Sequence, residues 1–245
     1  MTIPEPASSM EDTTAAVWWR GVFIATIAFL TLIDLFGAQA LLPMLVEAYD
    51  TTPANMGVAV NACTIGMAVA GLVIAIVGRS LDRKFWIWMS LAMLSVPTVL
   101  LGVVDNITLF ATLRVIQGLF MAAAFTMTIT YLSERCTVTA ATGAMAAYIT
   151  GNVASNLFGR MIAVGFADRL GLPASFYAFA TLNLVGAALA FIYFSRSSDD
   201  NKDRVQPNAQ TNPEHAWTAH LKNPALAASF GIGFLVLFVF IGVFT

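Results

Sequence analysis

Residues 21–43 read GVFIATIAFLTLIDLFGAQALLP, an apolar run that contains one acidic residue, Asp34. An α-helix needs about 20 apolar residues to cross the hydrocarbon core of a membrane, so this run is long enough. A charged aspartate near the middle of that core costs at least about 2.5 kcal/mol. Either Asp34 has a partner and a role inside the membrane, or the run is not a membrane span.

The composition of the 245-residue chain favours a membrane protein. It is 58 % hydrophobic and 11 % charged, whereas soluble domains carry about 25 % charged residues. The apolar runs predict spans at roughly 21–43, 55–78, 85–104, 107–132, 138–165, 174–195 and 225–245. These runs are too continuous for a β-barrel, whose strands alternate over about 10 residues. The sequence therefore predicts an all-α, multi-pass membrane protein with the lipid bilayer as its surroundings.

Basic residues set the orientation of the predicted spans, because cytoplasmic loops are enriched in Lys and Arg. With the N-terminus in the cytoplasm, nine basic residues fall inside and Arg169 falls outside. The polar stretch 196–223 then becomes a solvated cytoplasmic linker. We expect a cytoplasmic tail at 1–20, a six-helix half at 21–195, this linker, and a seventh helix at 224–245.

Asp34 and Arg114 are expected at the same depth. Asp34 lies 13 residues from the cytoplasmic end of the first span, which is about 20 Å along a helix. Arg114 lies 7 residues from the outer end of the fourth span, about 10 Å in. In a core about 30 Å thick these depths coincide. The pair is either a water-facing site for substrate or a proton, or a structural ion pair between two helices.

Two further patterns accompany this pair. Gln117 shares one side of its helix with Arg114, because the two residues are three apart. In the fifth span, small residues recur at every fourth position, which favours close helix packing; they are Gly143, Ala147, Gly151, Ser155, Gly159 and Ala163. Asn152 and Asn156 run beside this ladder, either to bond a neighbouring helix or to line a cavity.

The connection between the second and third spans reads GRSLDRK, residues 78–84. Gly78 can end a helix. Asp82 can accept hydrogen bonds from a helix N-terminus. Arg83 would hold the loop at the cytoplasmic face.

Together these features resemble the major facilitator superfamily from about residue 20 to residue 245. GRSLDRK is similar to its loop between helices two and three, and Arg114-x-x-Gln117-Gly118 is similar to the fourth-helix motif of its proton-coupled efflux branches. Gly151 and Gly159 match two glycines of its fifth-helix antiporter motif. The resemblance implies a half bundle of two three-helix repeats, alternating access around a central cavity, and an Arg114 that helps couple transport to protons.

The superfamily has twelve helices, so the resemblance implies an N-terminal half plus the seventh helix, with a C-terminal half missing. The expected function is proton-coupled export of a small solute across a bacterial inner membrane. Asp34 would be the proton-responsive group and residues 78–84 a cytoplasmic gate. In this family the fifth and second helices pack on helices of the other half. The ladder, and the small face of Ala62, Gly66 and Ala70, are therefore expected to lack a partner within residues 1–245.

Two alternatives belong to other classes. One is a membrane-embedded binding or regulatory protein that does not transport, which would leave no packing face without a partner. The other is an intramembrane enzyme, but no predicted span contains histidine and neither HExxH nor GxSxG occurs. We therefore expect no catalytic residue, metal or cofactor. The net charge of −2 implies no nucleic-acid partner.

Overall fold

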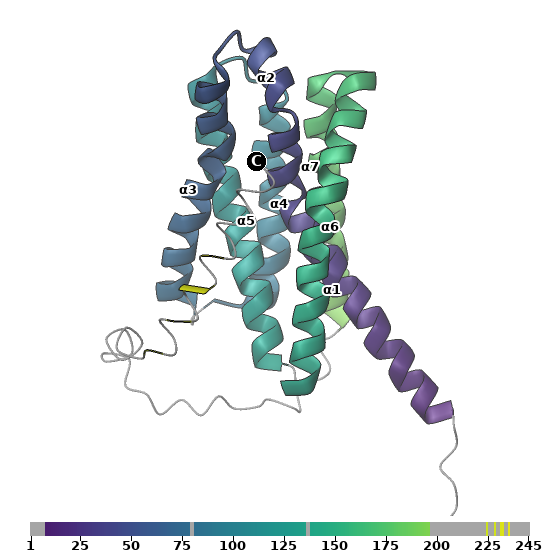
Figure 1. Cartoon of the computed structure of the whole chain (residues 1–245). Helices are drawn as coiled ribbons and strands as arrows, with labels where there is room; N and C mark the ends of the chain where they lie inside the picture. Colours follow the sequence, from purple (N-terminus) through teal and green to yellow (C-terminus); the bar gives the residue numbers. More distant parts are fainter. Residues whose placement is uncertain are drawn as a thin grey trace, which may run out of the picture. The chain divides into compact units, whose positions relative to one another are not determined.

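The structure is a computed structural model that describes residues 8–78, 81–135 and 138–196, with Pro224, Ala228, Gly231, Ile232 and Leu235. The chain divides into two compact units, residues 1–204 and 205–245, and the seven helices given below lie in the first. Every secondary-structure element in its described part is a helix (Figure 1). The helices are α1 (Ser8–Ala40), α2 (Leu42–Ala48), α3 (Pro53–Val77), α4 (Arg83–Leu101), α5 (Ile107–Arg135), α6 (Val138–Leu170) and α7 (Leu172–Arg196).

Five segments in the described residues are long and apolar enough to cross a membrane. They are Gly21–Ala40, Pro53–Ile74, Arg83–Leu101, Ile107–Leu132 and Leu172–Ser195, which confirms five predicted spans to within a few residues. The predicted fifth span is also a helix, α6, but its glycines, serine and asparagines make it less apolar than the other five. The linker at 196–223 and the seventh span lie almost wholly outside the described residues.

The helix ends follow from local sequence signals. Thr52 caps α3 by accepting a hydrogen bond from the Asn55 amide at 3.3 Å, and Pro53 occupies the first turn. Gly171 has a φ of +85°, which lets the chain turn sharply between α6 and α7. α1 begins at Ser8, so the helix of the first span extends back into the segment 1–20 that is predicted as a cytoplasmic tail.

The long helices pack in pairs that show an internal repeat. α1 packs on α6, α3 on α5, and α4 on α7. Let α1, α3 and α4 form one repeat and α5, α6 and α7 the other, so that α1 corresponds to α5, α3 to α6 and α4 to α7. Exchanging the two repeats then turns the α1–α6 pair into the α5–α3 pair. The α4–α7 pair is exchanged with itself. The packing thus confirms the predicted half bundle of two three-helix repeats.

Glycines bring the paired helices together at their backbones. A Cβ atom added at Gly118 on α5 would overlap the carbonyl oxygen of Cys63 on α3, and one added at Gly66 would overlap that of Val115. On the other pair, a Cβ at Gly151 would overlap the carbonyl oxygen of Ala25 on α1. Such close approach is the known use of small residues between membrane helices.

The small-residue faces therefore have partners within the chain, and the expectation that they would lack them was wrong. On α6, Gly151 and Gly159 lie against α1, and a Cβ at Gly159 would come within 3.1 Å of the Ile33 carbonyl oxygen. Ser155 is buried, and a Cβ at Gly21 would lie 3.9 Å from the Cβ of Ala147. At Gly143 an added Cβ would meet nothing within 4 Å. A small-residue pattern indicates that a helix packs closely, but it does not identify that helix.

Tyr49, between α2 and α3, is bonded to the loop between α4 and α5. Its hydroxyl donates to the carbonyl oxygen of Val104. Burial, followed by the negative charge of Asp105, raises the pKa of Tyr49 from 10.0 to about 12.

The neutral phenol is favoured in the folded state. Tyr49 is therefore expected to make its full contribution to the free energy of unfolding below about pH 10. This contribution should be lost as the pH rises toward about 12. Tyr49→Phe should lower the free energy of unfolding by about 0.5–1.5 kcal/mol at neutral pH. Unfolding measured in detergent from pH 7 to pH 12 checks this. A difference between the two proteins that stays constant over that range would contradict the titration.

Candidate functional site

Asp34 lies inside the bundle and is bonded from three helices. Its side chain is 1 % exposed. The Oδ2 atom accepts hydrogen bonds from Thr98 Oγ1 at 2.9 Å, Gln117 Nε2 at 2.9 Å and Asn183 Nδ2 at 2.8 Å. Thr98 belongs to α4, Gln117 to α5 and Asn183 to α7. One carboxylate oxygen therefore joins α1 to three other helices.

The three donors are not equivalent. Thr98 Oγ1 also lies 2.7 Å from the Leu94 carbonyl oxygen, and one hydroxyl hydrogen can serve only one of these two acceptors at a time. Gln117 has two amide hydrogens, and its Nε2 also donates to Thr98 Oγ1 at 2.8 Å. Asp34 can thus keep both amide bonds while the hydroxyl bonds elsewhere.

Arg114 is fully buried beside this group. Its Nε donates to the Val60 carbonyl oxygen at 3.0 Å, its Nη2 to Cys63 Sγ at 3.1 Å, and its Nη1 to Gln117 Oε1. Gln117 accepts from Arg114 through its oxygen and donates to Asp34 through its nitrogen. The two opposite charges are therefore linked through an amide.

Asp34 and Arg114 are brought together in the structure through Gln117, but their surroundings differ from those expected. Neither side chain is exposed, at 1 % and 0 %, so in this structure they do not face an aqueous cavity. The direct ion pair is replaced by the bridge through Gln117. Helices α1, α3, α4, α5 and α7 all contribute to this group, and together they bury both charged side chains.

Sequence reasoning missed Thr98, Asn183 and Cys63 as members of the site. Asn183 is the only asparagine in the predicted sixth span, 174–195. A polar side chain in an apolar run usually faces the bundle interior, and this signal could have identified it. Thr98 and Cys63 carry no such signal, because threonine often bonds the backbone of its own helix and buried cysteine behaves as a small apolar residue.

Asn156 and Arg160 belong to a second polar group. Arg160 donates from Nε to Asn156 Oδ1 at 2.9 Å and from Nη2 to Gln39 Oε1 at 3.3 Å. Gln39 Nε2 in turn donates to Asn61 Oδ1 at 3.2 Å, so the group joins α6, α1 and α3.

Asn152 joins neither group through a described hydrogen bond. Of the five predicted pathway residues, Asp34, Arg114 and Gln117 come together, whereas Asn152 and Asn156 lie elsewhere on α6.

The described part of the loop before α4 forms a local cap. Asp82 Oδ1 accepts a hydrogen bond from the Lys84 amide at 3.0 Å and so caps α4. Arg83 donates from Nη1 to the carbonyl oxygen of Gly78 and to that of Leu81, the latter at 2.9 Å. Gly78 ends α3. Through these contacts Arg83, at the start of α4, is bonded to the residue that ends α3.

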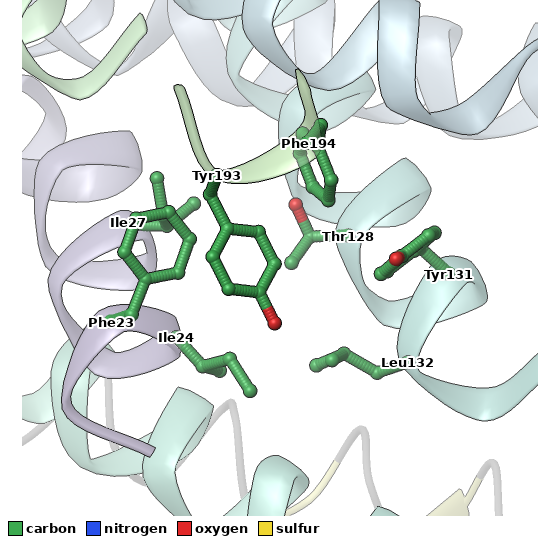
Figure 2. Close-up of a pocket in the computed structure, with 8 residues that line it drawn as sticks. All are labelled: Phe23, Ile24, Ile27, Thr128, Tyr131, Leu132, Tyr193 and Phe194. Carbon is green, nitrogen blue, oxygen red and sulfur yellow. The ribbon is translucent and has the colours of Figure 1, made fainter. Parts of the chain in front are cut away.

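A small apolar pocket opens between α1, α5 and α7 (Figure 2). It is lined by Phe23, Ile24, Ile27, Thr128, Tyr131, Leu132, Tyr193 and Phe194. Three of the helices that carry the Asp34 group supply these side chains, but Asp34 itself is not among them. The lining suits an apolar group.

Comparison with known proteins shows similarity to proteins that are named as transporters. The model of the Major Facilitator Superfamily matches residues 18–245. The chain is 26 % identical over 211 residues to a protein named "Uncharacterized transporter" of Buchnera aphidicola subsp. Schizaphis graminum, covering 86 % of this chain and 50 % of that protein. It is 24 % identical over 210 residues to the inner membrane transport protein YnfM of Escherichia coli (strain K12), covering 86 % and 50 %. The chain spans about half the length of the curated relatives it matches.

Proposed function

The chain belongs to the major facilitator superfamily, and on that premise we propose that it forms half of a proton-coupled transporter that exports a small solute. The observation that supports this most is the buried Asp34, which is held by side chains from three other helices. Ionisable groups at such depth in a membrane usually mark an ion or substrate path. The relatives are transporters by name, and the inner-membrane location is taken from the one in Escherichia coli.

Asp34 can serve as a switch because its bonding depends on its protonation state. An ionised carboxylate only accepts hydrogen bonds, whereas the acid also donates one. Gaining a proton therefore changes how α1 is held by Thr98, Gln117 and Asn183. Arg114 takes part through Gln117, because any shift of the guanidinium moves the amide that donates to Asp34.

Alternating access requires a second half against which this one can rock. In this account residues 1–20 lie in the cytoplasm, residues 196–223 form a cytoplasmic linker, and residues 224–245 begin the second half. Gly78, Asp82 and Arg83 form part of the cytoplasmic gate, where their local cap fixes the start of α4. Arg160 and Asn156 hold α6 on α1 so that the half moves as one body.

One observation favours a second candidate, a membrane-embedded binding protein without transport. The close-packing faces of α3 and α6 are already occupied by α5 and α1, so the half bundle leaves fewer packing faces open than expected. Such a protein would bind its solute but would not move it against a gradient.

Reconstitution of the full-length protein in lipid vesicles tests the proposal. When the vesicle interior is acidic, solutes of varied polarity should accumulate inside in exchange for protons, and a fluorescent pH indicator should show the interior becoming less acidic. A protein that binds solute but gives neither accumulation nor pH change would support the second candidate.

A further inference from the structure

Two buried oxygen atoms at the Asp34 site have no hydrogen-bond partner among the described residues. They are Oδ1 of Asp34 and Oδ1 of Asn183. The two side chains are already joined through their other polar atoms, because Asn183 Nδ2 donates to Asp34 Oδ2 at 2.8 Å. Buried polar atoms in proteins are almost always hydrogen-bonded, so a pair of unsatisfied acceptors in one contact requires an explanation.

We propose that Asp34 takes its proton on Oδ1 and donates it to Oδ1 of Asn183, which makes Asn183 the positioning residue of the proton site. The acid and the amide then form a closed pair with two hydrogen bonds, N–H to Oδ2 and O–H to Oδ1. The proton comes from the aqueous phase and forms one O–H bond, and no other group changes its protonation. The inference rests on the proposed proton exchange at Asp34.

Asn183 is the neighbour with a free acceptor. Gln117 Oε1 already accepts from Arg114. Thr98 Oγ1 already accepts from Gln117 and lies within hydrogen-bond distance of the Leu94 carbonyl oxygen. Asn183 Oδ1 is buried and unpartnered, on a side chain that is 0 % exposed. A single proton therefore satisfies both unpartnered atoms.

The charged groups around Asp34 are few. From α5, Arg114 faces the site across Gln117, and beyond it lies the thiol of Cys63 on α3. From α4 and α7 the facing side chains, Thr98 and Asn183, are uncharged. On the other side of α1, Gly159 of α6 lies against Ile33. Asn183 thus offers a neutral amide oxygen to which the O–H group of protonated Asp34 can donate.

The closed pair couples protonation to the position of α7. In the ionised state one hydrogen bond joins Asn183 to Asp34, and in the protonated state two bonds join them. Protonation therefore holds α7 more firmly to α1 while it weakens Asp34 Oδ2 as an acceptor for α4 and α5. Through this exchange the proton changes which helix holds the middle of α1.

Infrared difference spectroscopy on the 245-residue chain in lipid vesicles tests this without transport. A protonated carboxylic acid has a carbonyl stretching band, whose frequency rises when the group loses a hydrogen bond. We expect a band that appears on acidification and is absent in Asp34→Asn. In Asn183→Leu, which keeps a similar side-chain shape, the band should move to higher frequency. In the control Thr181→Val, on the exposed side of the same helix, it should stay in place.

The exchange variant Asp34→Asn/Asn183→Asp covers the case in which Asn183→Leu does not fold. It retains one acid and one amide with their places exchanged, so the band should return near its original frequency. A band that does not move in Asn183→Leu, or that is missing from the exchange variant, would overturn the acid–amide pair alone. If the unmodified chain shows no such band at any pH, Asp34 does not exchange protons, and the proposed function fails with the pair.

Discussion

Transport driven by a proton gradient is expected to fall at least tenfold when Asp34 is replaced by asparagine in the full-length protein. Asparagine keeps the size of the side chain and an oxygen that accepts from Gln117 and Asn183, but it cannot exchange a proton. A tenfold loss corresponds to about 1.4 kcal/mol of coupling. Solute accumulation in vesicles with an imposed pH gradient measures it.

The matched control for this variant is Asp168→Asn. Asp168 is an acidic residue on the exposed surface near the end of α6, and its replacement changes the net charge equally. Accumulation should stay within twofold of the unmodified protein. If Asp34→Asn also retains full proton-driven accumulation, then Asp34 has a structural role and the coupling proton binds elsewhere.

Gly118→Ala adds only one methyl group, but it is expected to destabilise the bundle strongly. The added methyl would overlap the backbone carbonyl of Cys63, which cannot move aside as a flexible side chain could. Overpacking of this kind costs about 1–3 kcal/mol, and we expect the upper part of that range. The α3–α5 pair would separate, and with it the Arg114 contacts to Val60 and Cys63. Unfolding of the chain in mixed detergent micelles gives the difference in free energy.

Gly143→Ala provides the control, because the same methyl meets nothing within 4 Å there. Alanine favours a helix over glycine by about 1 kcal/mol, so this variant should be as stable as the original or slightly more. Equal destabilisation by the two substitutions would show that the close approach of α3 and α5 does not hold the bundle together.

The sequence was sufficient for the parts of the fold that depend on apolar run length. The fixed rise of a helix per residue led us to expect Asp34 and Arg114 at one depth, and the structure joins the two through Gln117. The repeat of three helices was implied by the family resemblance and appears in the pairing of α1 with α6 and of α3 with α5. The extended start of α1 at Ser8 was missed, since residues 8–20 are not an apolar run.

Neighbours across helices could not be predicted in the same way. The ladder on α6 correctly indicated a close contact, but its spacing is equally compatible with any partner, and α1 is the one observed. The bridge through Gln117 and the bond to Asn183 depend on the rotation of four helices about their axes. A single sequence carries little information on that rotation when most sides of each helix are apolar.

The proton count on solute binding is the most direct test of the central claim, that Asp34 gains and loses the coupling proton. Solute is added to the full-length protein in weakly buffered detergent solution, and the pH change gives the number of protons exchanged per protein. We expect solute binding to release about one proton from each unmodified protein, since binding and protonation are linked. We expect no release from Asp34→Asn. The same proton release from both proteins would contradict the claim.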